Sequence, residues 1–240
     1  MRINALLDSY RYCIENNKKL PSQHSKEKNI RKLGNKPLIA HTIETALDSK
    51  IFDHVIVSTE DQEIASISKK YGADVPFLRP KYLAKDKVIY GDVVMHAIEK
   101  LSDLGYEFDT IASRDCTVPF IDKNDLKNAM NLYTTKECDG VHSVCRAYSN
   151  PYFGMYEPDS QGYLYISKTT KKRITTRQDS PIVYQVNGLY INSKKKLIET
   201  NDLFAGKILP YEISQEHGLM IDDEIQFKFA EFLYRLGHNK

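Results

Sequence analysis

A basic segment near the start of the chain has the chemistry of a phosphate-binding loop. Residues Lys18 to Lys32 are rich in lysine and arginine and include a single glutamate. They follow a short apolar run, Ile3 to Leu7, which is typical of a first β-strand. A loop in that place can hold a triphosphate through ammonium groups and backbone N–H donors. A solvated basic loop explains the same composition, so charge alone leaves both interpretations open.

Two aspartates, Asp115 and Asp222, have the chemistry of magnesium ligands. Mg²⁺ is usually held by one or two carboxylates together with substrate phosphates and water. Asp222 and its neighbour Asp223 also precede an apolar helical stripe, where acidic residues commonly cap a helix, so that both roles stay open. Arg79, in the run FLRPKYLAKD, is either a surface arginine or a nucleotide contact.

Several catalytic motifs are absent from the sequence, which excludes whole function classes. There is no G-x-x-x-x-G-K-[ST] of a P-loop NTPase, no G-x-G-x-x-G of a dinucleotide site and no G-x-S-x-G nucleophile elbow. The net charge of +2 lacks the positive field of a general nucleic-acid binder. The four cysteines show no C-x-x-C spacing, so we expect reduced thiols. Without a membrane-length apolar run or a signal-peptide pattern, we expect a cytosolic protein with no nucleic-acid and no membrane partner.

The elements that must position these residues alternate between short strands and amphipathic helices. Besides Ile3 to Leu7, strands are expected at residues 54–58 and 109–113. Helices are expected at residues 37–48, 91–104 and 124–133, and Thr59, three residues before Gln62, is the expected cap of a further helix. This alternation predicts an α/β fold with a mostly parallel central sheet covered on both faces. Ligands of such sheets lie beyond the carboxyl ends of the strands, where Asp115 and the basic segment fall.

The composition changes at about Val141. Residues 141–191 are rich in Tyr, Val, Ile and Thr and contain several turn signals, a pattern that predicts hairpins. The C-terminal segment returns to a helical pattern, with an apolar stripe formed by Ile225, Phe229, Phe232, Leu233 and Leu236. The chain has 240 residues and no internal repeat or low-complexity linker. We therefore expect a single domain over residues 1–240, with a β-rich excursion at about 141–183.

Five stretches, taken in order along the chain, resemble one known family. They are KNIRKLGNKPLIAHTIETAL (Lys28–Leu47), His54–Asp86, TVPFI (Thr117–Ile121), RQDSPIVYQVNGLYI (Arg177–Ile191), and LPYEI followed by Ile221–Leu233. This ordered set is similar to the CMP-sialic acid synthetases (acylneuraminate cytidylyltransferases), including the branch that acts on bacterial nonulosonic acids such as legionaminic and pseudaminic acid. The resemblance spans most of the chain.

The resemblance implies a fold, an assembly and a reaction. The fold is a Rossmann-like nucleotidyltransferase sheet, and the assembly is a homodimer in which the β-rich excursion reaches the partner subunit. In the reaction, the anomeric hydroxyl of an acidic nine-carbon 2-keto sugar attacks the α-phosphorus of CTP. CMP-sugar forms, pyrophosphate leaves, and Mg²⁺ is the cofactor. Such transfers depend on positioning and on cations that neutralise the developing charge.

The resemblance also implies roles for individual residues. Lys28 and Asn29 match the Lys-Asn that follows the family's phosphate loop, so Lys28 is expected in catalysis and Asn29 in nucleotide binding. Arg79 matches an arginine near the cytosine, and Asp115 stands where many members carry a glutamine that faces nucleotide and sugar. Asp222 matches a metal-binding aspartate. The expected sugar-binding residues are Arg177, Gln178, Asn187 and Gly188.

The N-terminal loop departs from the family pattern. Most members follow the first strand with Pro-Ala-Arg and a short Gly/Ser-rich loop that carries an essential arginine and lysine, whereas this chain continues with Asp8-Ser9-Tyr10-Arg11 and a long polar segment. Arg11, and Lys19 or Lys18, fill the two catalytic positions if the loop is lengthened. In the other alignment Ser22-Gln23-His24 takes their place, and the catalytic cation is absent.

The segment expected to bind the metal ion also departs from the family pattern. Members usually carry Asp-Ile-Asp where this chain has Met220-Ile221-Asp222, so one of two expected metal carboxylates is missing. Asp115 would supply the second carboxylate from a different strand. The sequence therefore supports an active cytidylyltransferase first, and second a catalytically degenerate homologue that binds nucleotide or sugar. A transferase for another nucleotide or sugar, such as a 3-deoxy-octulosonate, is a third interpretation.

Overall fold

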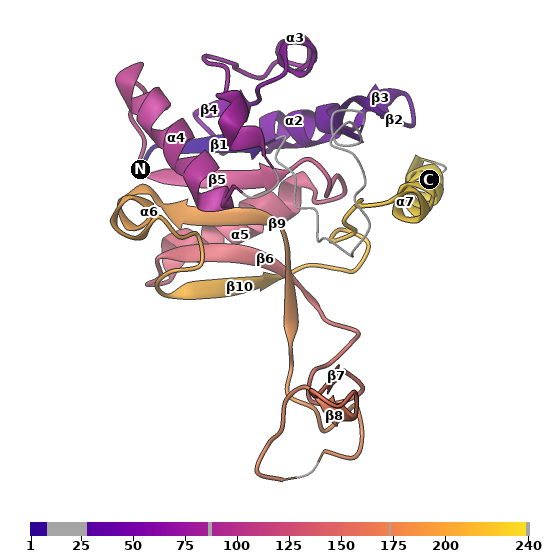
Figure 1. Cartoon of the computed structure of the whole chain (residues 1–240). Coiled ribbons are helices and arrows are strands. Elements are labelled where there is room, and N and C mark those ends of the chain that lie inside the picture. Colours follow the sequence, from indigo (N-terminus) through magenta and orange to yellow (C-terminus); the bar gives the residue numbers. More distant parts are fainter. Residues whose placement is uncertain (9–27, 86–87, 173, 239–240) are drawn as a thin grey trace.

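The core of the protein is one six-stranded sheet (Figure 1). The computed structural model describes residues 1–8, 28–85, 88–172 and 174–238. The strand order is β10-β6-β9-β5-β1-β4. The strands are β1 (Ile3–Asp8), β4 (His54–Ser58), β5 (Thr110–Asp115), β6 (Gly140–Arg146), β9 (Tyr184–Ser193) and β10 (Ile208–Glu212). β1 pairs in parallel with β4 and β5, and β10 pairs in parallel with β6, whereas β9 runs antiparallel to both β5 and β6. The expected mostly parallel α/β sheet is confirmed.

Helices cover both faces of the sheet. The helices are α2 (Leu38–Ser49), α3 (Gln62–Lys70), α4 (Tyr90–Asp103), α5 (Lys123–Thr135), α6 (Lys194–Thr200) and α7 (Glu224–His238), with a 3₁₀ turn at Lys81–Ala84. Alternate strand residues point to opposite faces. Ala5 and Ala112 therefore face α2 and α5, while Leu6 and Ile111 face α4 and α6. Between the strand β1 and α2, a small hairpin is formed by β2 (Lys32–Leu33) and β3 (Lys36–Pro37).

The helices α3 and α5, which follow β4 and β5, are each capped by an aspartate. Asp122 Oδ1 accepts the N–H groups of Asn124 and Asp125, and the Asp125 carboxylate accepts the N–H of Asp122, which completes a capping box for α5. The prediction that Thr59 caps α3 was wrong, because Asp61 accepts the N–H groups of Glu63 and Ile64. Thr59 instead accepts the N–H of Asp61.

The β-rich excursion begins later than its composition suggests. Residues 140–146 form β6 inside the central sheet, and the excursion occupies residues 147–183, with a small hairpin of β7 (Tyr156–Pro158) and β8 (Leu164–Ile166). In Figure 1 the excursion extends away from the sheet. Every residue of β6 before Arg146 is buried, as expected of a strand inside the sheet, even though His142 and Ser143 are polar.

The apolar stripe of α7 does not face the protein. Phe227 and Ala230 are buried against Leu33, Leu38 and Ile221. Four members of the stripe are exposed instead: Ile225, Phe229, Phe232 and Leu236. No helix among the described residues has the length and apolar character to cross a membrane.

Gly188 in β9 occupies a position that only glycine accepts without strain. Its φ of +75° lies in the left-handed region, and a Cβ there would lie 2.7 Å from the Cβ of Val118. The loop after β5 therefore packs directly on the β9 backbone.

Replacing Gly188 with alanine tests this packing, and Gly105 is the matched control. Gly105 has a φ of +83° with nothing within 4 Å of the added Cβ, so Gly105→Ala carries the backbone penalty alone. We expect G105A to lower the free energy of unfolding by about 1 kcal/mol. G188A should lower it by about 1–3 kcal/mol more, because Val118 must move. Urea unfolding measures both, and equal losses would show that the loop does not pack on β9.

Candidate active site

The candidate site lies at the carboxyl edge of the parallel strands. Strand pairing brings Asp8 next to both Ser58 and Asp115, so the ends of β1, β4 and β5 meet there. Because β9 is antiparallel, its early residues reach this same edge: Leu189 pairs with Arg114 near the end of β5. Asn187 and Gly188, expected from the resemblance to bind sugar, therefore lie near the strand ends that carry Asp115.

The segment between β10 and α7 crosses this edge and joins its parts. The N–H of Ile221 donates to the Thr117 carbonyl at 2.9 Å, which ties the segment to the loop after β5. Lys28 Nζ donates to the carbonyl of Asp222. The structure thus brings together Lys28 and Asp222, two of the residues predicted from sequence.

The Asp222 carboxylate is left available by the way α7 is capped. Asp223 accepts the N–H of Gln226 at 2.8 Å, and the Gln226 side chain accepts the N–H groups of Asp222 and Asp223. Asp223, rather than Asp222, is therefore the cap of α7. Burial raises the pKa of the Asp222 carboxyl, while the nearby Lys28 ammonium lowers it and Asp223 raises it further. In the part of the chain that the structure describes, no hydrogen-bond donor reaches this carboxylate.

This donor set fits a magnesium ion bound together with phosphates. A partly buried carboxylate with a raised pKa gains from a neighbouring cation, and Mg²⁺ commonly takes one carboxylate with phosphate oxygens and water. Met220, at the position of the missing aspartate, packs against the hydrophobic core instead. Asp115 is partly buried, and the Tyr190 hydroxyl donates to its Oδ2 at 3.4 Å.

Arg79 is buried and ion-paired, so it is not a surface arginine. Only 3% of the residue is exposed, and its Nη2 lies 2.6 Å from Glu60 Oε2. Its N–H donates to the Thr59 carbonyl just after β4. Asn29, the other expected nucleotide-binding residue, is also buried. Both residues lie on segments next to strand ends of the candidate edge.

The Asn187 side chain is oriented by the β10–α7 segment. Its Nδ2 donates to the Gly218 carbonyl at 2.6 Å, and a carbonyl can accept only from the amide's nitrogen. Gly218 lies against the Cys145 thiol, where an added Cβ would be 2.1 Å from the sulfur. Only glycine therefore fits at this contact.

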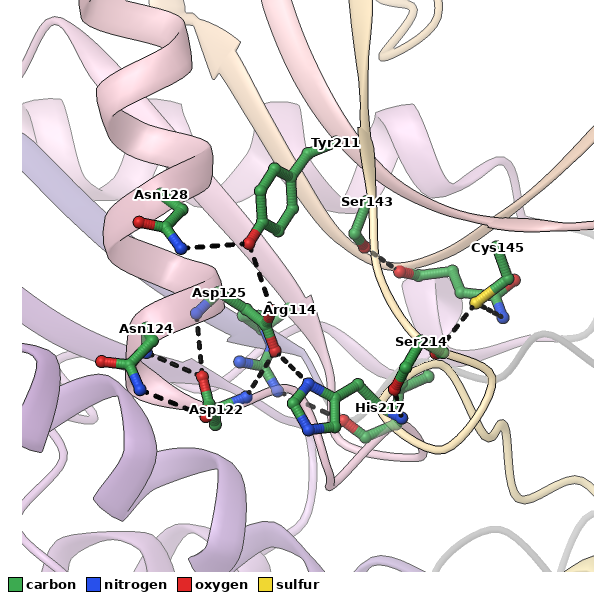
Figure 2. A network of polar contacts seen from close by, with 12 residues as sticks. Arg114, Asp122, Asn124, Asp125, Asn128, Ser143, Cys145, Tyr211, Ser214 and His217 are labelled. Atoms are coloured by element: carbon green, nitrogen blue, oxygen red, sulfur yellow. Dashed lines mark hydrogen bonds and ion pairs between the residues drawn. The ribbon is translucent and has the colours of Figure 1, made fainter.

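A second polar network lies on the α5 side of the sheet (Figure 2). His217 Nδ1 lies 2.6 Å from Asp125 Oδ2, and the Tyr211 hydroxyl donates to Asp125 Oδ1 at 3.2 Å. Burial raises the pKa of Asp125, but the hydrogen bonds from His217 and from the Asp122 N–H outweigh it and lower the pKa overall. The hydrogen bond to Asp125 raises the pKa of His217 despite partial burial. The pair thus connects α5 to the β10–α7 segment.

Arg114 lies beside this network and argues against a metal ion in it. The carboxylates of Asp122 and Asp125 and the imidazole of His217 lie within 4.8 Å of one another. Their carboxylate oxygens already accept hydrogen bonds, and Arg114 is fully buried with Nη2 donating to the Val118 carbonyl at 3.2 Å. Burial lowers the pKa of Arg114 to about 10, where it remains charged at neutral pH. A cation beside this guanidinium would be repelled, so we interpret the cluster as a structural network.

Some predicted site residues are not brought to this edge. Arg177 and Gln178 lie on the excursion, where Arg177 stacks over the ring of Tyr148 at 4.3 Å. Arg11 and Lys19 lie outside the described residues, as do the alternatives Lys18 and Ser22-Gln23-His24.

Sequence reasoning missed Arg114, Asp125, His217 and the Glu60 partner of Arg79. The spacing of Asp122 and Asp125 before a helix is a capping-box pattern and was a usable signal for one of them. The other residues gave no local sequence signal. Asp125 and His217, for example, are separated by 92 positions and come into contact only in the folded chain.

The chain is similar to known proteins along most of its length. A family model described as "Cytidylyltransferase" matches residues 20–233. The chain is 31% identical over 220 residues to a CMP-N,N'-diacetyllegionaminic acid synthase of Campylobacter jejuni, covering 90% of this chain and 91% of that protein. It is 30% identical over 219 residues to a pseudaminic acid cytidylyltransferase of the same species, covering 90% and 93%.

A solved structure shows the same fold. It is CMP:2-keto-3-deoxy-manno-octonic acid synthetase in complex with CTP, which superimposes with a TM-score of 0.70 at 13% identity and covers 99% of this chain and 100% of that one. At this identity the likeness concerns the fold alone. The family model and the two relatives show that this chain belongs to the cytidylyltransferase family.

Proposed function

We propose that this chain is an active enzyme that transfers CMP from CTP to the anomeric hydroxyl of a sialic-acid-like nonulosonic acid. The proposal rests on one observation. At the carboxyl edge of the sheet, Lys28 Nζ donates to the backbone carbonyl of Asp222, in a chain that belongs to the cytidylyltransferase family. Two relatives that match nine-tenths of the chain are named for legionaminic and pseudaminic acid, which supports a substrate of that class.

The reaction forms one bond and breaks one. The anomeric oxygen bonds to the α-phosphorus of CTP as its proton leaves to solvent or a base, and the bond from the α-phosphorus to pyrophosphate breaks. The Lys28 ammonium would stabilise charge on the phosphates, and Asp222 would hold Mg²⁺ against them. When bound, Mg²⁺ would neutralise the charge that develops on the phosphate oxygens.

Pyrophosphate release tests the proposal. The protein is assayed with CTP, Mg²⁺ and sialic, legionaminic or pseudaminic acid, and with ATP, GTP or UTP in place of CTP. We expect turnover with CTP and one acid, and its loss when EDTA removes Mg²⁺. Folded protein that releases no pyrophosphate with any pair would support the second candidate, a degenerate binding homologue, which the missing aspartate at Met220 favours. Turnover with a different nucleotide would contradict the CTP assignment.

We further propose that a homodimer completes the site. The excursion carries exposed large apolar side chains, which on a monomer would face water: Tyr148, Met155, Tyr156, Tyr163, Leu164, Tyr165 and Ile182. It also carries Arg177 and Gln178, which are exposed. The excursion as a whole extends away from the sheet (Figure 1). A second copy would cover the apolar residues and receive Arg177 and Gln178 at its own sugar site.

Mixing two inactive variants tests this shared site. Asp222→Asn removes the expected metal carboxylate, and Arg177→Ala removes the residue expected from the partner. Each variant alone should lose about 10²-fold or more in kcat/KM. If the site is shared, a mixed dimer contains one intact site, and refolding the variants together should restore about a quarter of wild-type activity.

The control for this mixture is Asp223→Asn, an exposed neighbour that caps α7 and keeps an acceptor oxygen. It should retain near-wild-type activity. Failure of the mixture to regain activity, with both proteins dimeric by light scattering, would contradict a site built from two copies.

A further inference from the structure

The network around Asp125 and His217 is outside the groups expected to touch substrate, yet it connects to one of them. His217 is the residue before Gly218, and the Gly218 carbonyl accepts from Asn187 Nδ2. The backbone of this turn is further held by the Gly218 N–H, which donates to the Ser214 carbonyl at 2.9 Å. The position of His217 therefore sets the position of the Gly218 carbonyl.

One polar atom of the Asn187 side chain has no hydrogen-bond partner among the described residues. Its Nδ2 is used by Gly218, whereas its Oδ1 is buried and accepts no hydrogen bond from any group that the structure describes. Buried acceptors are rarely left without a donor, so this atom points to a donor brought by a ligand. The orientation of the amide decides which atom is offered, because a turned amide would offer a donor instead.

The partner of His217 is itself held rigidly. Asp125 belongs to the capping box of α5, accepts the N–H of Asp122 at 3.0 Å and accepts from the Tyr211 hydroxyl. The other charged or titratable groups that act on the pair are Arg114, Asp122 and Glu216. With Asp125 held by Asp122 and Tyr211, its contact to His217 fixes the turn that follows.

We propose that Asp125 and His217 are positioning residues for the sugar side of the reaction. By holding the Gly218 carbonyl against Asn187, the pair keeps Asn187 Oδ1 as the acceptor for a hydroxyl or amide N–H of the acid substrate. This inference rests on the proposed transfer of CMP to a nonulosonic acid. Asp222 is held separately, through Ile221 and Lys28, so the pair acts on acid binding more than on CTP binding.

Two substitutions of His217 separate positioning from other roles. In His217→Asn (H217N) the amide nitrogen takes the place of Nδ1 and can still donate to Asp125, whereas in His217→Gln (H217Q) the nitrogen takes the place of Nε2. We expect H217Q to raise the KM for the acid about tenfold with little change in the KM for CTP, and H217N to stay within about twofold of wild type. Steady-state kinetics with pyrophosphate release measures both constants, normalised to the folded fraction from circular dichroism.

His54 supplies the control, since it forms another His–Asp contact, 3.4 Å from Asp74, at the start of β4 and away from the site. H54Q should leave both KM values unchanged. Should H217Q not fold, Asp125→Asn weakens the same contact and should raise the KM for the acid in the same direction.

The outcomes distinguish this inference from the function on which it rests. Wild-type protein without turnover overturns the proposed function and this inference with it. Active wild type with an unchanged KM for the acid in H217Q, or in D125N if H217Q does not fold, overturns the inference alone. H217N as impaired as H217Q would assign His217 a role through Nε2 or charge, and would also overturn it.

Discussion

The reversed direction of β9 is the constraint on which the candidate site depends. In a purely parallel sheet the first residues of a strand lie at the edge opposite the ligand site. Because β9 runs antiparallel between β5 and β6, its early residues Asn187 and Gly188 lie instead at the carboxyl edge. The same reversal means that the chain enters β9 from the excursion on the side of the site. The direction of one strand thus places Asn187 and Gly188 at this edge and lets the excursion leave the sheet on the same side.

The segment between β10 and α7 turns this edge into one connected unit. It bonds to the loop after β5 through Ile221, to Asn187 through Gly218, to α5 through His217 and to Lys28 through the Asp222 carbonyl. Its own length contains no helix or strand. Its shape is therefore set by these polar contacts together with the packing of Ile213, Met220 and Ile221 against the core. The loss of one polar contact would shift groups that the others position.

Much of the fold could be predicted from sequence because its signals are local. Hydrophobic periodicity identified the strand at residues 54–58 and the helices α2, α4 and α5 to within a few residues. The predictions from sequence were wrong where a competing side chain determines the helix cap or where tertiary packing determines which face is buried. Asp61 displaced Thr59 as the cap of α3, and α7 buries Phe227 and Ala230 rather than the stripe that includes Phe229.

The candidate site was predictable only in part, for a similar reason. The resemblance identified Lys28 and Asp222, which the structure brings into contact, and strand ends indicated Asp115. The contact between Asp125 and His217 joins positions far apart in the chain, so no rule based on local spacing predicts it. Arg177 is held on the excursion, over the ring of Tyr148, so the sugar-binding role that the resemblance implies would require a second copy.

We propose that Lys28 and Asp222 mark the place where the triphosphate and its metal ion bind. A crystal structure with CTP and Mg²⁺ is the most direct test. We expect the phosphates beside Lys28, the metal ion bound to the Asp222 carboxylate and the cytosine near Arg79. A nucleotide bound away from the Lys28–Asp222 contact, or a metal ion without Asp222 as a ligand, would contradict it.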